Sequence, residues 1–392
     1  MGLGFFLKTF KELYMKRIFT LLFLSSSLMA TSALAQGFYH VRNHATGRYM
    51  IMTDNQKGTS SEKTGADLTA VETSRNIEKV FTHPGAILYV TSLSGKSDVY
   101  SQNSSIGQLS GGKLYPYLTA IGDGTYTIHG SYSTYVVYLG DQDKPGKDDA
   151  KLADLTAGKD RTYWELLPID NSATGQFIGI KPNVQTADGK YWGTILCGFE
   201  FTLQSDGMKA YYVDEVSDTE FNLKEITSKK VPAHVPVIIE CASDDYSKNI
   251  IRPTSKDGAK DASAKLGNKL GGVYFDRGDN THDSGTSYNA TTMRVIGIDD
   301  NKNLIFRKAT NDDLTVYEDK GKYYLPHNKA YLGVSSSAAD VLHVKGSSGI
   351  ETISTEVAPV KEGTYTLSGQ RVADEPTRPG IYIRNGKKII IK

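Results

Sequence analysis

The sequence predicts an all-β protein. Apolar and polar residues alternate along many short segments, such as GFYHVRN from Gly37, and this period of two is typical of strands with one buried face. The 392 residues include 38 Gly and 24 Tyr, a composition that favours short strands joined by tight turns. The length exceeds that of one ordinary core, so we expect two or three domains.

The first 35 residues have the order of a signal peptide. The basic pair Lys16-Arg17 follows Met15, the apolar run IFTLLFLSSSLMA comes next, and the small-x-small sequence ALA occupies 33–35. We therefore expect translation to start at Met15 and cleavage to remove residues 1–35. The mature protein is expected to be exported.

Charge and hydropathy exclude two classes of partner. Loss of residues 1–35 changes the formal net charge from +1 to −2, because this segment carries four basic residues and one acidic residue. A chain without excess positive charge has no electrostatic basis for binding nucleic acid. No later apolar run reaches the roughly 18–20 residues of a membrane helix, so we expect no transmembrane helix in the mature chain.

Residues 36–170 contain a repeated pair of strands. The three pairs begin near Tyr39, Tyr89 and Tyr126, in GFYHVRNHATGRYMIM, AILYVTSLSGKSDVYSQ and GTYTIHGSYSTYVVYLGD, and the strand RTYWELLPI closes the segment. Three such units in about 130 residues predict a threefold closed β architecture.

GFYHVRNHATGRYM resembles the opening hairpin of ricin-type β-trefoil lectin-like modules, and YWELLPI is similar to their closing tryptophan strand. The resemblance implies a β-trefoil-like domain that recognises a carbohydrate ligand. Acidic or amide residues after the second strands would accept sugar hydroxyls, and aromatic rings would stack on sugar faces. The predicted ligand-binding residues are Asp54, Asn103, Tyr132, Tyr135, Asp141 and Trp164. The alternative is that the aromatic residues form the core of the domain.

Residues 171–345 contain further short apolar segments, which predict a β-sandwich-like region of one domain or two subdomains. The polar stretch 253–268 is the one place where a short helix or a loop is expected. VPVIIE and YLPHNKAYL resemble segments of β-sandwich modules in exported proteins of Bacteroidetes-type bacteria. Cys197 and Cys241 lie in strand-like runs, where they would either form a disulfide or stay as buried free thiols.

Residues 346–362 are small and polar and predict a linker, which is followed by two hairpins over 363–392. This tail resembles the C-terminal sorting domain of type IX secretion substrates. The matching residues are Leu367, Gly369, Gln370, Pro379, Gly380, Tyr382, Lys387 and Lys388. The resemblance implies a secretion machinery as partner and an extracellular or outer-membrane surface location. The alternative is an edge hairpin that completes the preceding sheet.

No motif for catalysis, metal or cofactor is present. The eight histidines lack metal-ligand spacing, and the sequence contains no Gly-x-Ser-x-Gly elbow and no phosphate-binding loop. The acidic loop 276–285 could hold calcium or present Arg-Gly-Asp to a receptor. We expect a non-catalytic glycan-binding protein. The alternatives are a structural or adhesive surface protein that binds host protein, a protease inhibitor, or a hydrolase accessory protein.

Overall fold

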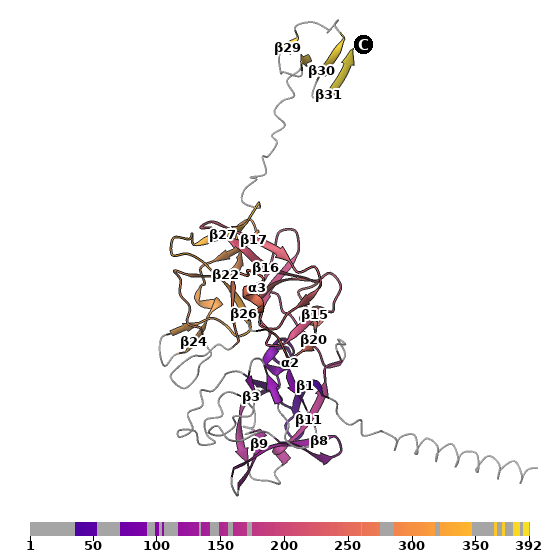
Figure 1. Cartoon of the computed structure of the whole chain (residues 1–392), viewed down its shortest axis with the longest axis vertical. Helices are drawn as coiled ribbons and strands as arrows, with labels where there is room; N and C mark the ends of the chain where they lie inside the picture. Colours follow the sequence, from indigo (N-terminus) through magenta and orange to yellow (C-terminus); the bar gives the residue numbers. More distant parts are fainter. Residues whose placement is uncertain are drawn as a thin grey trace, which may run out of the picture. The chain divides into compact units, whose positions relative to one another are not determined.

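The structure is a computed structural model that describes residues 36–52, 71–91, 99–101, 104–105, 117–132, 135–141, 149–155, 160–170, 175–259, 261–274, 286–317, 322–346, 364–366, 371–372, 379–384 and 387–391. Strands dominate these residues, which confirms the all-β class (Figure 1). The chain forms two compact units, Met1–Val344 and Lys345–Lys392. The predicted signal peptide lies outside the described residues. Within the described ranges, no helix has the length and hydropathy needed to cross a membrane.

The N-terminal domain, residues 36–170, is built on one antiparallel sheet. Its strands are β1 (Gly37–Asn43), β2 (Tyr49–Met52), β3 (Val71–Ser74), β4 (Leu88–Val90), β5 (Val99–Ser101), β6 (Ser104–Ser105), β7 (Tyr117–Gly122), β8 (Thr125–Tyr132), β9 (Tyr135–Asp141), β10 (Asp149–Leu155) and β11 (Tyr163–Pro168). Pairing runs from β1 through β2, β3, β10, β9, β8 and β11 and returns to β1, so these strands form a closed ring. The threefold trefoil arrangement within this ring stays a prediction.

The core of this domain follows from the alternation along its strands. On β1, Tyr39 and Val41 point inward, and they pack with Met50, Leu88 and Trp164 in one apolar cluster. The period of two places these side chains on one face, and ring closure brings that face around a common centre.

A short helix, α2 (Ile77–Thr82), and a 3-10 turn, η2 (Pro84–Ala86), lie where the N-terminal domain meets the second domain. Asn76 caps α2 by accepting a bond from the Lys79 N–H. Phe81 packs edge-on against Phe177 of the second domain, with ring centroids 4.8 Å apart. The two domains therefore share an apolar cluster, which also includes Tyr49 and Ile250.

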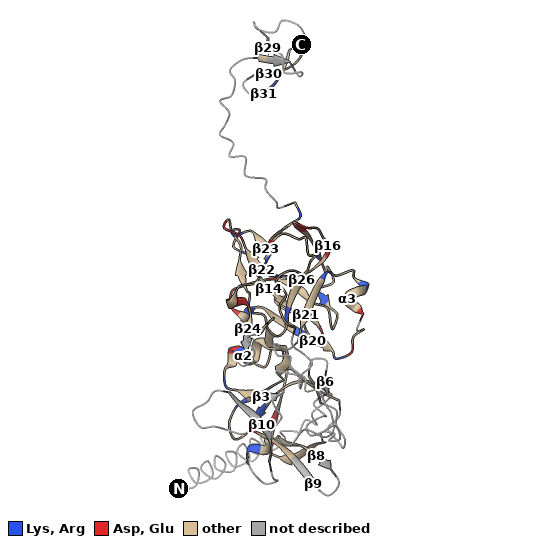
Figure 2. Ribbon diagram, turned by 90° about the vertical axis from the view of Figure 1, so that its left-hand side faces the viewer, with Lys and Arg blue, Asp and Glu red and all other residues tan. Residues whose placement is uncertain are grey.

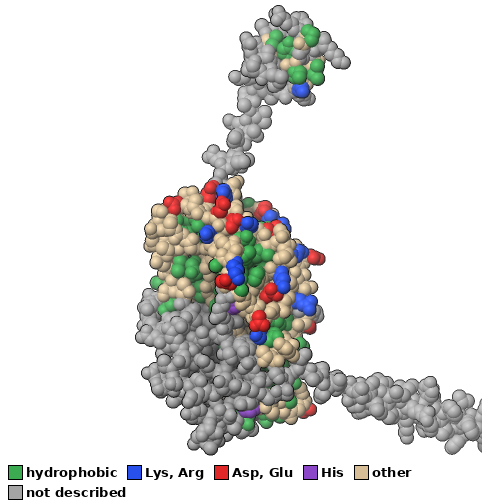
Figure 3. Space-filling view, in the orientation of Figure 1, with side chains coloured by type: hydrophobic (Ala, Val, Ile, Leu, Met, Phe, Trp, Pro, Cys, Tyr) green, Lys and Arg blue, Asp and Glu red, His purple; other side chains and the backbone are tan. Residues whose placement is uncertain are grey.

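The second domain, residues 175–344, holds the remaining strands of the larger unit. They are β12 (Ile178–Gly179), β13 (Val184–Gln185), β14 (Tyr191–Ile195), β15 (Glu200–Leu203), β16 (Lys209–Val216), β17 (Glu220–Glu225), β18 (Lys230–Val231), β19 (Val237–Cys241), β20 (Ile250–Ser255), β21 (Leu270–Val273), β22 (Met293–Ile298), β23 (Leu304–Arg307), β24 (Thr315–Tyr317), β25 (Lys322–Tyr324), β26 (Lys329–Gly333) and β27 (Val341–Val344). A ten-stranded sheet joins both halves of this region through the parallel pair β17–β27. Figure 2 shows acidic and basic residues interspersed along the ribbon of the domain, and Figure 3 shows their side chains interspersed on one of its faces.

Helix α3 (Ala262–Lys265) lies inside the polar stretch 253–268, as the sequence predicts. The sequence analysis expected a helix in this stretch alone, and that expectation was wrong, because α2 forms in the N-terminal domain. The period of α2 is hard to detect in six residues, and its stability comes from packing against the second domain.

The C-terminal unit has four strands, β28 (Thr364–Thr366), β29 (Arg371–Val372), β30 (Gly380–Arg384) and β31 (Lys387–Ile391). They pair in the order β29-β28-β30-β31 and form a sheet of their own. The tail is therefore not an edge hairpin of a preceding sheet among the described strands.

Candidate functional site

Four of the six predicted ligand-binding residues remain without a described side chain. Asp54 and Asn103 lie outside the described residues. Tyr132 and Tyr135 are Cα partners at the end of the β8–β9 pairing, and the structure describes their backbone only.

The structure places Asp141 in the interior of the N-terminal domain. Its carboxylate is fully buried in the N-terminal domain and forms an ion pair with Arg48 at 3.1 Å, and the guanidinium is fully buried too. The same carboxylate accepts hydrogen bonds from Thr46 Oγ1 at 2.5 Å and Thr73 Oγ1 at 3.0 Å. A buried charge requires such partners. Asp141 therefore ties together β9, the turn between β1 and β2, and β3.

Trp164 lies in the interior of the same domain. The indole is fully buried in the apolar cluster, and its N–H donates to the carbonyl of Leu139 at 2.9 Å. A tryptophan that stacks on a sugar needs an exposed face. The burial of Trp164 favours the alternative, an aromatic core position.

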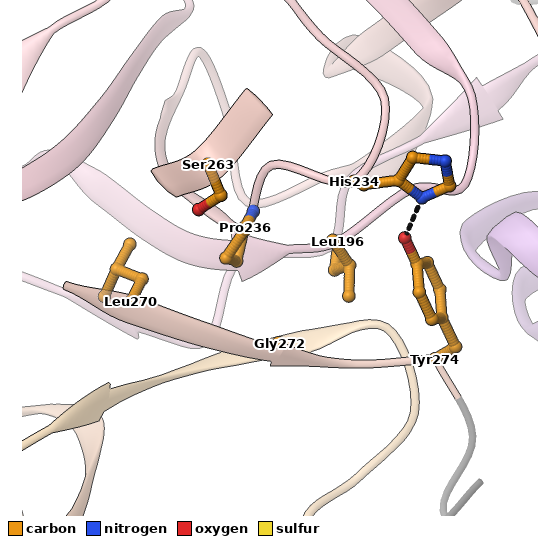
Figure 4. Close-up of a pocket in the computed structure, with 7 residues that line it drawn as sticks. All are labelled: Leu196, His234, Pro236, Ser263, Leu270, Gly272 and Tyr274. Carbon is orange, nitrogen blue, oxygen red and sulfur yellow. Dashed lines mark hydrogen bonds between the residues drawn. The ribbon is translucent and has the colours of Figure 1, made fainter. Parts of the chain in front are cut away.

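A cavity of about 330 Å³ lies in the second domain, and we call it the junction cavity (Figure 4). The lining side chains come from the end of β14, the loop between β18 and β19, helix α3 and the β21 segment. They are Leu196, His234, Pro236, Ser263, Leu270, Gly272 and Tyr274. Tyr274 also packs against the apolar cluster of the N-terminal domain, so the cavity borders the junction of the two domains.

Local backbone features keep the junction cavity open. A Cβ on Gly272 would lie 2.6 Å from Leu196 Cδ2 and 3.1 Å from Pro236 Cβ, so a glycine is needed for β21 to approach these residues. His234 has φ +65, in the left-handed region, and its N–H donates to the carbonyl of Cys197 at 3.0 Å. This turn directs the imidazole toward the cavity (Figure 4).

The polar groups of the cavity are few and placed at opposite ends. The hydroxyl of Tyr274 and Nδ1 of His234 share a hydrogen bond of 2.5 Å, and the hydroxyl of Ser263 lies toward the other end (Figure 4). Burial raises the pKa of Tyr274, and nearby Cys197 raises it further, so the phenol stays protonated at neutral pH. Apolar walls with a few polar groups are the usual make-up of small-molecule sites.

The two cysteines are free, buried thiols, which is one of the two states that the sequence left open. Burial raises the pKa of Cys197 and raises that of Cys241 to about 12. A nucleophilic cysteine needs a lowered pKa, so neither thiol has the properties of one. Among the described residues, no three His, Cys, Asp or Glu side chains are grouped to hold a metal ion. The acidic loop 276–285 lies outside those residues.

The residues of the sorting-like motif are only partly described. Leu367, Gly369 and Gln370 lie outside the described residues. Pro379 precedes β30, Gly380 opens this strand and Tyr382 lies at its centre. Lys387 and Lys388 open β31, and Lys388 is exposed.

Sequence reasoning missed the junction cavity, because it considered the histidines only for metal-ligand spacing. The signal that could have found it is the VPAHVPV segment, where two prolines enclose one polar ring in an apolar run. Its partner Tyr274 is 40 residues away along the chain, and no local pattern links them.

Comparisons with known proteins give no family for this chain. No family model matches it, and no curated protein matches it. A solved structure described as "Structure and mode of action of a mosquitocidal holotoxin" matches at 12% identity with a TM-score of 0.25, over 76% of this chain and 34% of that chain. The chain thus spans about a third of that protein's length. A likeness this weak indicates neither fold nor function.

Proposed function

We propose that this chain is an exported, non-catalytic protein that binds glycans. The observation that carries the proposal is the junction cavity, in which the apolar side chains of Leu196, Pro236 and Leu270 face hydroxyl-bonding groups. A sugar ring has the matching chemistry, because its C–H faces are apolar and its hydroxyls both donate and accept.

The size of the cavity supports one sugar residue as the unit recognised. Its volume of about 330 Å³ is close to the lower end of the roughly 300–1,000 Å³ typical of small-molecule sites. His234 and Tyr274 would bond hydroxyls at one end, and Ser263 would bond a hydroxyl at the other. A terminal sugar of a longer glycan fits this description.

The N-terminal domain is a second region for glycan binding, on the strength of its resemblance to ricin-type modules. Its candidates there are Tyr132 and Tyr135, at the end of the β8–β9 hairpin. The two regions give different predictions, because a variant in one should leave binding to the other unchanged.

A glycan array with the mature chain from Gln36 tests the proposal. We expect binding to glycans that share a terminal sugar, and a loss of about three- to tenfold in affinity for Tyr274→Phe, the effect of one hydrogen bond. Tyr191→Phe, on a half-buried tyrosine outside the cavity, is the matched control. Weaker binding in Tyr132→Ala or Tyr135→Ala would instead assign glycan binding to the N-terminal domain. A blank array would contradict both.

We also propose that the protein leaves the cell through the secretion machinery that its C-terminal unit resembles. Intact mass and terminal sequencing of protein from native cells test this proposal. A form that starts near Gln36, lacks the C-terminal unit and is found outside the cell would support it. A form that ends at Lys392 and is retained in the periplasm would contradict it.

A further inference from the structure

A second, smaller pocket of about 160 Å³ is lined by the side chain of one lysine, Lys329. Its walls include Asn183, Thr194, Leu325, Lys329 and Tyr331. The pocket shares no lining residue with the junction cavity. We call it the Lys329 pocket.

The surroundings of Lys329 are unusual for a lysine. In the part of the chain that the structure describes, its Nζ forms no ion pair, and it donates to Asn183 Oδ1 at 3.5 Å, the outer limit of a hydrogen bond. The carboxylates of Asp312 and Asp313 line the same pocket, but Asp313 is held by Arg307 at 2.7 and 3.1 Å. Among the described residues, neither carboxylate forms an ion pair with Lys329.

The electrostatic setting favours the neutral amine. Burial lowers the pKa of Lys329, the charge of Lys181 lowers it further, and Cys241 acts in the opposite direction. Desolvation of a lysine raises the share of its neutral, nucleophilic amine.

Hydrogen bonds of the two neighbouring residues fix the backbone at Lys329. Asn328 has φ +53. Its side-chain Nδ2 donates to the carbonyl of Leu196 at 2.8 Å, and its backbone carbonyl accepts from the Leu196 N–H at 3.0 Å. The N–H of Ala330 donates to Thr194 Oγ1 at 3.2 Å. Lys329 is thus anchored on both sides at the start of β26, while its half-buried side chain reaches the pocket.

We propose that Lys329 is a site of covalent capture for small aldehydes, including the open-chain form of a reducing sugar. The nitrogen lone pair attacks the carbonyl carbon, and a proton passes from nitrogen to the carbonyl oxygen to give a carbinolamine. Loss of the hydroxyl group and the remaining N–H proton as water then forms a C=N bond. No oxidant or reductant takes part, and water reverses the reaction. The site goes beyond the glycan proposal and does not depend on it.

Reductive trapping tests the proposal on the mature chain. The protein is treated briefly with glycolaldehyde and cyanoborohydride at pH 7, and modified lysines are measured by peptide mass mapping. We expect Lys329 to react at least about threefold faster than the exposed Lys248 and Lys265, because each unit of pKa lowering gives about tenfold more free amine. The ratio should fall as the pH approaches 10. A rate equal to or below that of the control lysines at every pH would overturn the proposal.

Two variants sharpen the test. Asn183→Asp keeps an oxygen beside Nζ but adds a carboxylate, which stabilises the ammonium, so trapping at Lys329 should slow at least about threefold. Lys329→Arg should remove this adduct and leave Lys248 and Lys265 unchanged. Unchanged trapping in Asn183→Asp would contradict the proposed role of the neutral amine, whether or not Lys329→Arg folds.

Discussion

The buried pair of Arg48 and Asp141 makes a quantitative prediction for Asp141→Ala. Both side chains are fully enclosed, and the carboxylate also accepts bonds from Thr46 and Thr73. The substitution removes the countercharge of a buried guanidinium, which costs about 3–5 kcal/mol of folding free energy. At about 2–4 °C per kcal/mol, the melting temperature should fall by roughly 6–20 °C.

Thermal unfolding of the mature chain, followed by circular dichroism, measures this effect. Asp206→Ala is the control, because that residue is exposed, and we expect its stability to change by no more than about 0.5 kcal/mol. Glycan binding by the folded Asp141→Ala protein should equal that of the wild type. A melting temperature within about 2 °C of the wild type, together with lost glycan binding, would refute the structural role and restore Asp141 as a ligand-binding residue.

Three further predictions concern buried groups. Burial lowers the pKa of His40 to about 4, whereas in the unfolded chain this histidine is protonated below about pH 6.5, so about 3 kcal/mol of stability should be lost between pH 6.5 and 4. Urea unfolding should show a smaller loss in His40→Gln than in the wild type, and equal losses would contradict this prediction. Cys197 and Cys241 should react with a thiol reagent only after unfolding in urea, and rapid labelling of the native protein would disprove their burial. Gly272→Ala should lower the free energy of unfolding by about 1–3 kcal/mol, because its Cβ meets Leu196 Cδ2 at 2.6 Å; an unchanged urea midpoint would show that Leu196 moves freely.

The period of two was sufficient to predict the strand content, because it reports which face of each strand is buried. The same pattern does not predict which strands pair with one another. The closed ring depends on the pairing of β1 with β11, where Tyr39 lies opposite Pro168, and no local pattern encodes such a distant contact. The sequence also could not distinguish a stacking tryptophan from a core tryptophan, since Trp164 has the same chemistry in both roles and burial alone decides.

The site was harder to predict than the fold, because its residues meet only through tertiary packing. His234 and Tyr274 come from different loops of the second domain. Among the described residues, Lys329 forms no ion pair although Asp312 and Asp313 line its pocket, and such a tertiary arrangement cannot be read from the sequence. Arg294 is a similar case: its buried guanidinium donates to four backbone carbonyls, those of Ala290, Met293, Ala338 and Ala339.

The most direct test of glycan binding in the junction cavity is saturation-transfer NMR with a panel of monosaccharides. The comparison is between the mature wild-type chain and Ser263→Leu, which places a larger side chain into the cavity from the half-buried helix α3. We expect transfer to at least one sugar in the wild type and its loss in Ser263→Leu, and a melting temperature within about 2 °C of the wild type would show that the variant is folded. Equal transfer in both proteins, or none in either, would contradict the assignment of the junction cavity as a sugar site.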